Sequence, residues 1–323
     1  MKQFSEDDHC LIGLASMAVV GPRALQQVLR AARTAGVSVA DYVGQEPGRA
    51  LVPGADVEIS EAARRGRAVR RRVEQAGGRV LVAGRPGYPD RLTNVEGPGG
   101  PPVLFVRGEP DLLQGGGVAV VGSRRPSGTA LRAARRLAEE LAGAGSVIVS
   151  GGARGVDTAA HRAALRRGAT VLVTPLGLER FRWRRFRPEP RHDGRWCVVS
   201  QFAPGSGWRD AHALMRNALI VALSEAVVAF EPRDTGGTWN ACQHALAMRR
   251  PLFIVAGSPS GAKERGRRKL VRMGAAALDP DCLPDAREFA ELVEQYRPPP
   301  CPEQGGLFEV EKVPTKRAPG KPD

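Results

Sequence analysis

The chain has 323 residues, of which 42% are hydrophobic and 25% charged, and its 48 basic and 34 acidic side chains give a formal net charge of +14. This composition suffices for a sizeable folded core and excludes a chain that is disordered throughout. No apolar run reaches the roughly 18 residues that a membrane span needs, and the N-terminus opens with acidic residues, so we expect a soluble, cytoplasmic protein with no membrane partner.

The cysteines argue against a metal site and against a disulfide framework. There are five of them, an odd number, and they lie far apart without the paired spacing of zinc ligands. We therefore expect no metal and no cofactor. Only six of the 48 basic residues are lysine, so the positive charge is almost wholly guanidinium, which suits two-pronged contacts to phosphate. A GC-rich genome also produces an arginine excess. The positions of the arginines along the chain therefore have to show whether the charge serves binding.

The positive charge is concentrated in the middle of the chain. Residues 1–60 carry a net charge of −2, residues 61–117 carry +4, residues 118–300 carry +12, and residues 301–323 are neutral. Basic arms that bind nucleic acid without sequence preference are usually terminal. Here the excess falls in the segment with the strongest pattern of folded elements, which indicates a charged surface with a defined shape.

Residues 1–60 are expected to form a small helical domain of the SAM or helix-hairpin-helix kind. Apolar periodicity predicts two short helices between residues 9 and 44, separated by Gly21 and Pro22. Residues 61–117 are expected to be a linker helix and an extension of the core, with a helix over 60–76 whose N-cap is Ser60, followed by a strand in PPVLFVRG. Residues 299–323 are expected to be a disordered, proline-rich tail.

From residue 118 onward, short apolar runs alternate with amphipathic helical segments. The runs cover residues 118–121, 146–150, 170–174, 197–200, 226–230 and 252–255. Continuous apolar strands separated by helices indicate a parallel sheet buried on both faces. We therefore predict an α/β, doubly wound, mainly parallel Rossmann-like domain over 118–298, with its ligand at the carboxyl ends of the strands.

Two glycine-rich turns follow the first two of these strands. Their candidate phosphate-binding residues are Gly122, Ser123 and Arg124 in the first turn, and Ser150, Gly151, Gly152, Arg154 and Gly155 in the second. Asp157 is placed to cap the helix after the second turn and to pair with His161. A hydrolytic Ser/His/Asp site using Ser123 or Ser150 lacks a nucleophile elbow, and neither a Walker A nor a dinucleotide fingerprint is present.

Several motifs in one order resemble the DNA-processing protein A family (DprA, also called Smf). They are Val-Gly-Ser-Arg at 121–124, Ser-Gly-x-Ala-Arg-Gly-x-Asp-Thr-x-x-His at 150–161, Gly-Ala-Thr at 168–170, and Arg216-Asn217 ahead of Ile-x-x-Leu-Ser at 220–224, together with upstream Tyr-Pro and Pro-x-Leu-Phe motifs. The resemblance implies a protein that binds and protects single-stranded DNA and helps to load RecA recombinase during DNA uptake (natural transformation, competence) or recombination, without catalytic turnover. It places Arg124, Arg154, Arg216 and Asn217 in the binding pocket and leaves a homodimer open.

The chain also departs from that family. Where the family has Ser-Gly-Ser/Thr after a later strand, residues 234–238 read Asp-Thr-Gly-Gly-Thr, which looks like the phosphate loop of LOG-type nucleotide-binding proteins. Gly236, Gly237 and Thr238 are therefore further candidate phosphate-binding residues. The alternative function is a nucleotide sensor or a nucleotide-processing enzyme, with Glu231 or Asp157 as its acid/base group.

A divergent segment at 179–196 interleaves seven arginines with four aromatic residues. The aromatics Phe181, Trp183, Phe186 and Trp196 are candidates for stacking on the bases of a single strand while the arginines follow its phosphates. The alternative is that these rings anchor the loop on the core. A second basic cluster at 263–272 is predicted at the same sheet edge, with a solvated helix face as the equally weighted alternative.

Overall fold

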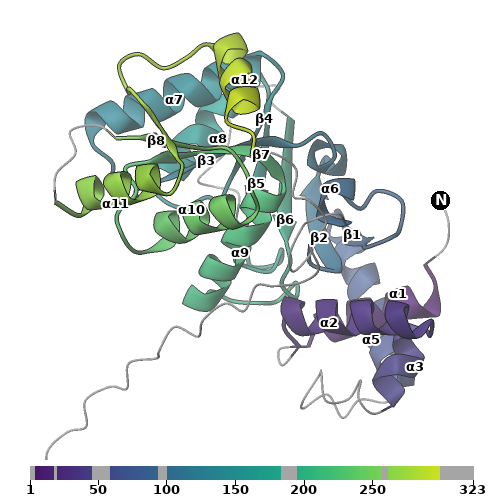
Figure 1. Ribbon diagram of the computed structural model, residues 1–323. Coiled ribbons are helices and arrows are strands. Elements are labelled where there is room, and N and C mark those ends of the chain that lie inside the picture. Colours follow the sequence, from purple (N-terminus) through teal and green to yellow (C-terminus); the bar gives the residue numbers. More distant parts are fainter. Residues whose placement is uncertain are drawn as a thin grey trace, which may run out of the picture.

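The computed structural model of the protein describes residues 4–17, 20–45, 59–93, 100–182, 195–256 and 261–298. Within these ranges a sheet of nine strands runs through the molecule in the order β1-β2-β6-β5-β4-β3-β7-β8-β9, and helices cover both of its faces (Figure 1). The strands are β1 (Gly78–Val82), β2 (Val103–Gly108), β3 (Gly117–Gly122), β4 (Val147–Ser150), β5 (Ala169–Val173), β6 (Arg195–Ser200), β7 (Ser224–Phe230), β8 (Leu252–Val255) and β9 (Ala276–Leu278).

The sheet is mainly parallel and doubly wound, as the sequence predicts. The strands from β6 across to β9 pair in parallel, whereas β1 with β2 and β2 with β6 pair antiparallel. The chain winds outward from β3 through β4, β5 and β6, then returns to the other side of β3 and continues through β7, β8 and β9. All six strands predicted from the apolar runs are present, with ends shifted by one or two residues.

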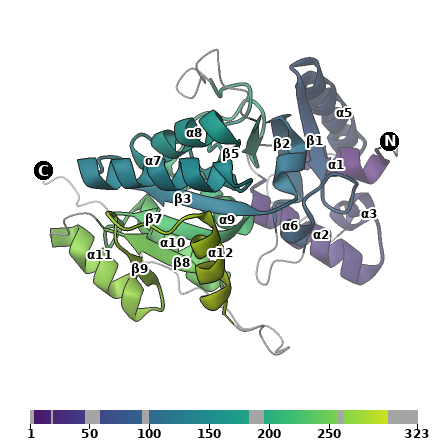
Figure 2. The same cartoon turned by 90° about the horizontal axis from the view of Figure 1, so that it is seen from above.

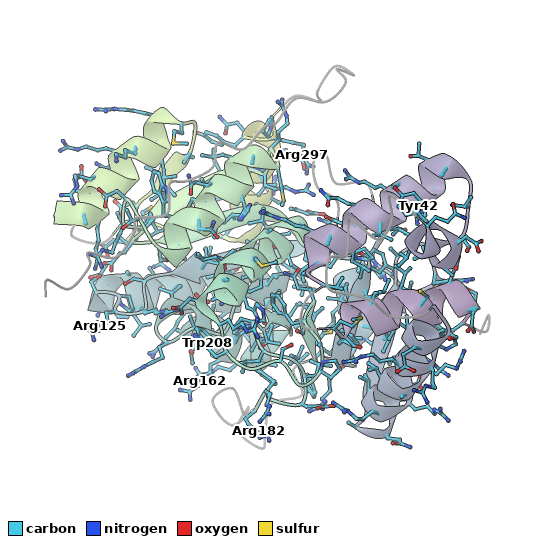
Figure 3. All side chains as sticks on the ribbon, turned by 90° about the horizontal axis from the view of Figure 1, so that it is seen from below. Tyr42, Arg125, Arg162, Arg182, Trp208 and Arg297 are labelled. Carbon is cyan, nitrogen blue, oxygen red and sulfur yellow. The ribbon has the colours of Figure 1, made fainter. Side chains whose placement is uncertain are left out.

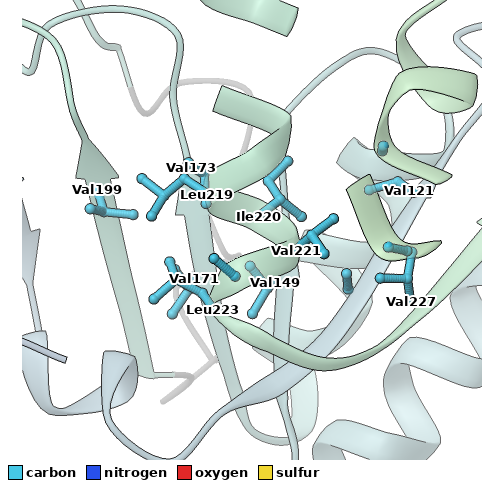
Figure 4. Packing of buried hydrophobic residues seen from close by; sticks show 14 of the residues in the cluster. Val121, Val149, Val171, Val173, Val199, Leu219, Ile220, Val221, Leu223 and Val227 are labelled. Carbon is cyan, nitrogen blue, oxygen red and sulfur yellow. The ribbon is translucent and has the colours of Figure 1, made fainter. Parts of the chain in front are cut away.

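Two layers of helices sandwich the parallel strands (Figure 2). One face packs against α7 (Gly128–Gly143), α8 (Val156–Arg167) and α12 (Ala286–Gln295). The other packs against α9 (Asp210–Ala222), α10 (Gly237–Ala247) and α11 (Gly261–Arg272). On this second face, valines of β4, β5 and β6 meet Leu219, Ile220 and Leu223 at α9 (Figure 4). Burial of apolar side chains on both faces explains why these strands read as unbroken apolar runs.

The N-terminal helices form a layer of their own on the β1–β2 end of the sheet. This helical layer consists of α1 (Glu6–Ala15), α2 (Pro22–Ala35), α3 (Val39–Gly44) and α5 (Ile59–Gln75), and it shares a core with β1, β2 and β6. The helices α1 and α5 cross at glycines: a Cβ on Gly66 would lie 1.8 Å from the His9 carbonyl oxygen, and one on Gly13 would lie 1.9 Å from that of Ala62. The expected division after residue 60 therefore passes through this packed layer.

Smaller features differ from the expectations. The helix predicted over 60–76 begins at Ile59, so Ser60 lies inside α5 and is not its N-cap. The short elements α6 (Asp90–Thr93) and η1 (Pro110–Leu113) connect the strands around β2. The strands β1 and β9 were not predicted. The expected disordered tail at 299–323 lies outside the described residues.

Candidate nucleic-acid interface

The winding of the sheet creates a site between β3 and β7. The strand order reverses at this point, and in open α/β sheets the loops beyond the carboxyl ends of the two strands diverge there and leave room for a ligand. The turn at 123–127 follows β3, the turn at 151–155 follows β4, and the loop at 231–236 follows β7. Together with the loops that follow β5, β6 and β8, these three segments lie at the carboxyl ends of the parallel strands and make up what we term the carboxyl edge.

The two glycine-rich turns are in direct contact. The backbone N–H of Val156 donates to the Ser123 carbonyl over 3.3 Å, and the Ser123 N–H donates to Phe230 of β7 over 3.1 Å. Gly155 has a φ of +83°, and a Cβ there would lie 2.4 Å from the Ser123 carbonyl oxygen. Only glycine satisfies both conditions. This contact brings Arg124, at the tip of the first turn, next to the second turn.

Arg124 and Arg154 are both exposed. Within the described residues, no carboxylate lies within ion-pair distance of either guanidinium. Exposed, unneutralised guanidinium groups beside helix N-termini favour an anionic ligand because both the charge and the helix dipole attract it. The structure thus brings together the two arginines that the sequence predicted for phosphate binding.

A third arginine lies beneath them. Arg216 of α9 is only 6% exposed, and its Nε has no hydrogen-bond partner within the described part of the chain. Its guanidinium covers Gly151, where a Cβ would lie 1.4 Å from one terminal nitrogen. Burial lowers the pKa of Arg216 to about 10; the carboxylate of Asp157 opposes this change and Arg124 adds to it. Arg216 still remains a cation at neutral pH.

Asp157 balances part of this buried charge. Its carboxylate is 4% exposed and accepts a hydrogen bond from the Ala153 N–H over 3.2 Å. Burial raises its pKa, against the opposing effects of Arg216 and of backbone donors. Gly155, not Asp157, is the N-cap residue of α8, so the predicted capping role is replaced by a bond within the preceding turn. His161 instead contacts Thr170, with Nδ1 and Oγ1 2.7 Å apart.

The glycines make room for protein atoms. A Cβ on Gly122 would lie 2.7 Å from both the Phe230 carbonyl oxygen and a Val156 methyl group. Gly151 accommodates Arg216, and Gly155 accommodates the first turn. Glycine at these three positions therefore allows the turns and the buried arginine to pack closely, and the contact of their backbone with phosphate stays a prediction. Gly152, with a φ of +70°, supplies the bend in the second turn.

Asn217 supports the neighbouring loop. Its side-chain amide donates to the Gly237 carbonyl over 3.0 Å and to the Asn240 side chain over 2.9 Å. These bonds fix the first turn of α10, which carries Thr238. Gly236 and Gly237 are exposed, and no atom lies within 4 Å of a Cβ built on either. The Gly-Gly-Thr loop is therefore open to solvent at the carboxyl edge.

The two candidate acid/base groups make internal contacts. Glu231 is 2% exposed; its carboxylate accepts bonds from Lys263 and from the Ser127 N–H at 3.0 Å. Burial raises its pKa, but the bonds from Lys263 and Ser127 outweigh this and hold the pKa below its usual value. Asp157 is equally enclosed. A nucleotide-processing enzyme would need one of these carboxylates to reach its substrate.

The residues of a hydrolytic triad are not assembled. Ser150 is fully buried and its hydroxyl donates to the Val120 carbonyl over 2.6 Å. The Ser123 hydroxyl accepts from the Arg125 N–H. His161 is also fully buried, and burial lowers its pKa to about 3. The bonds of both serines are local and structural.

The aromatic segment falls only partly within the described residues. Trp183 and Phe186 lie outside them, as do the arginines between 184 and 191. Phe181 is 8% exposed and packs in the core shared by the helical layer and the sheet, with Trp196 partly buried against the same core. Phe181 is therefore an anchor and has no face free for a base. Base stacking by Trp196 stays a prediction, and its partly buried side chain offers little exposed surface for it.

Sequence reasoning overlooked an aromatic residue at the carboxyl edge. Trp208, in the loop between β6 and α9, is 53% exposed. A tryptophan directly before an arginine in a Gly-Ser-Gly loop after a strand was the signal available. Among the described residues, no group of three or more metal-ligating side chains occurs, and no helix is long and apolar enough to cross a bilayer.

Comparison with known proteins gives one consistent family. The model of the family "DNA recombination-mediator protein A" matches residues 79–287. DNA processing protein DprA of Streptococcus pneumoniae is 34% identical over 177 residues, which are 54% of this chain and 62% of that protein. The Bacillus subtilis DprA is 31% identical over 194 residues, 59% and 65% of the respective chains. The matched segments thus span less than two thirds of these relatives.

Solved structures show the same fold. The S. pneumoniae DprA structure superposes with a TM-score of 0.66 at 23% identity, covering 90% of this chain and 98% of that one. The Helicobacter pylori DprA structure, which concerns that protein's single-stranded DNA binding mode, superposes with a TM-score of 0.56 at 25% identity, covering 68% and 96%.

Proposed function

The chain belongs to the DNA recombination-mediator protein A family, and we propose that it binds single-stranded DNA at the carboxyl edge of its sheet. One observation carries the proposal: Arg124 and Arg154 are exposed without carboxylate partners among the described residues, beside two helix N-termini and above the buried cation of Arg216. The H. pylori relative, whose structure concerns single-stranded DNA, has the same fold.

The charges favour a polymer over a single nucleotide. Unneutralised arginines occur on two successive turns, and the chain carries a net charge of +14. Several phosphates in a row can use such a distribution, and each neutralised phosphate releases counterions, which makes the affinity depend steeply on salt. A mononucleotide has one phosphate group to offer and gains little from a second cation farther along the edge.

We also propose the wider role that the family name suggests. Bound single strands would be protected and passed to RecA recombinase during DNA uptake or recombination, in the cytoplasm and without catalytic turnover. The enclosure of Glu231 and Asp157 supports the last point, because neither carboxylate is positioned to exchange a proton with a ligand. A homodimer stays a prediction.

The test is a titration of Arg124→Ala and Arg154→Ala with a labelled oligothymidine at several salt concentrations. Each substitution should weaken binding, and each should reduce the slope of log affinity against log salt by about 0.7 for every phosphate that the variant no longer neutralises. Arg287→Ala is the matched control, because Arg287 is an exposed arginine of α12 that pairs with Glu291.

A panel of mononucleotides in the same assay distinguishes the alternative. The open loop at Gly236 and Gly237 is the observation that favours a nucleotide ligand. If a mononucleotide stabilises the protein against heat while the oligothymidine does not, the carboxyl edge is a nucleotide site and our proposal fails. It also fails if both arginine variants bind the oligothymidine as the unaltered protein does.

A further inference from the structure

The cations at the two ends of the carboxyl edge have different kinds of partner. At the β7–β8 end, carboxylates pair with most basic side chains of α11: Lys263 with Glu231, Arg265 with Asp234, and both Arg267 and Arg268 with Glu264. Lys269 lies 6.0 Å from the centre of the Trp239 ring. Four of the six cations of α11 are thus held in ion pairs, although their three carboxylates cancel only half of the six positive charges.

At the opposite end, beyond β4, β5 and β6, Arg180 and Arg182 bond to carbonyl oxygens and, within the described residues, not to carboxylates. Arg180 donates to the Gly205 carbonyl over 3.3 Å, and Arg182 donates to the Glu179 carbonyl over 2.6 Å. Carbonyl oxygens hold a guanidinium in place without cancelling its charge. The carboxylate of Glu179 pairs with Arg72 of α5. The guanidinium groups of Arg180 and Arg182 thus keep their positive charge for contacts to phosphates.

Trp208 lies at this charged end. Its loop is held on the segment that carries Arg180, because the Gly177 N–H donates to Ser206 over 2.9 Å and the Glu179 N–H donates to Pro204 over 3.0 Å. The indole N–H donates to the Asp210 carboxylate over 3.2 Å, which restrains the ring while 53% of the residue stays exposed. Figure 3 shows Trp208 on the same side of the molecule as Arg125, Arg162 and Arg182.

A restrained, exposed indole among arginines has the properties of a stacking platform. Bases stack on aromatic faces in proteins that bind single strands, while cations nearby follow the backbone. A protein-docking surface would instead present a broader apolar area, whereas among the described residues of this region the other large exposed apolar side chain is that of Leu214 of α9. The surroundings of Trp208 therefore favour a nucleic-acid base.

We propose that Trp208 stacks on a base of the bound single strand, and that the strand runs from the turn at 123–127 past Arg154 toward Arg180 and Trp208, away from α11. The inference rests on the proposed function. It also supplies what the phosphate contacts lack, since a stacking residue requires an unpaired base and so distinguishes single-stranded from double-stranded DNA.

The experiment compares an oligothymidine with an abasic strand of the same length, on the unaltered protein, Trp208→Ala, Trp208→Phe and Leu214→Ala. Trp208→Ala should weaken oligothymidine binding about 5- to 150-fold and leave abasic binding unchanged. Trp208→Phe should recover most of the affinity. Leu214→Ala, which removes exposed apolar surface but no ring, should bind like the unaltered protein.

A second readout is intrinsic fluorescence. The chain has four tryptophans, and stacking on Trp208 should quench part of the emission when oligothymidine binds. Trp208→Phe should lose that quenching while it still binds. The path of the strand over the protein is tested with two variants. Arg180→Ala should reduce the slope of log affinity against log salt, whereas Arg265→Ala at the α11 end should leave that slope unchanged.

The outcomes separate the two proposals. If the unaltered protein binds oligothymidine and Trp208→Ala binds it equally well, the stacking assignment is overturned while the proposed function stands. If Trp208→Ala and Leu214→Ala lose equal affinity for the abasic strand, this surface makes general apolar contacts with the strand. That outcome would also overturn the stacking assignment. If the unaltered protein binds neither strand, the proposed function fails and the stacking assignment fails with it.

Discussion

Gly151→Ala should displace the buried guanidinium of Arg216. The new methyl carbon would lie 1.4 Å from a terminal nitrogen and 2.1 Å from the central carbon of the guanidinium, whereas ordinary contacts begin near 3.4 Å. The guanidinium must therefore retreat by about 2 Å within a site where Arg216 is 6% exposed. Overpacking of this kind costs about 1 to 3 kcal/mol of unfolding free energy.

The same displacement should weaken DNA binding. Arg216 is a buried cation beneath Arg124 and Arg154, so moving its charge should reduce the affinity for oligothymidine. Urea denaturation measures the stability, and fluorescence anisotropy measures the binding.

Two controls make this prediction specific. Gly237→Ala introduces the same methyl group at the same edge, where no atom lies within 4 Å, so its unfolding free energy should change by less than about 1 kcal/mol. In an Arg216→Ala background the obstacle is absent, so Gly151→Ala should cost little there. If Gly151→Ala alone is as stable as the unaltered protein and binds as tightly, the guanidinium does not lie over Gly151 and our account of the buried cation is refuted.

Three further predictions concern other parts of the molecule. Gly66→Ala should force α1 and α5 apart and lower the unfolding free energy by about 1 to 3 kcal/mol or more, whereas oligothymidine affinity should stay the same; a large loss of affinity in the folded variant would contradict the separation of the two regions. The folded-state pKa of His161, about 3, lies below its unfolded value of 6.5, so the unfolded chain binds the extra proton between these values. This histidine should therefore contribute a stability loss of up to roughly 1.4 kcal/mol per pH unit as the pH falls below 6.5, and urea denaturation of His161→Gln should show a flatter pH profile. Lys263→Met should leave the buried Glu231 carboxylate without its cation and cost about 3 kcal/mol or more in urea denaturation, and adding Glu231→Gln should recover part of it; an unchanged unfolding free energy in Lys263→Met would show that the ion pair contributes nothing to stability.

The parallel core was predictable because its signals are local. Each strand from β3 to β8 is a run of apolar residues buried on both faces, and each is followed by a turn rich in glycine or polar residues. The position of Arg124 and Arg154 at the carboxyl edge follows from the same pattern, since parallel strands end at one edge. Family resemblance then directed attention to Arg216, which lies far away in the sequence.

Contacts between distant segments were not predictable. Three examples are the pairing of β1 with β2, the bond of Lys263 to Glu231 and the packing of Arg216 over Gly151. Each depends on how distant elements meet in space, which the apolar periodicity within a segment does not predict. For the same reason the internal packing at Gly122, Gly151 and Gly155 was not foreseen. Trp208 was missed because its exposure depends on the whole loop.

The antiparallel strands β1 and β2 cover an edge of the parallel sheet that a truncated fragment would expose. β2 pairs with β6 from Phe105 opposite Ser200 to Gly108 opposite Cys197, and β1 then pairs with β2. A fragment cut to start at β3 would leave β6 as a bare edge strand with unpaired N–H and C=O groups, a template for aggregation. Fragments for crystallisation or NMR should therefore begin no later than α5, which packs on β1.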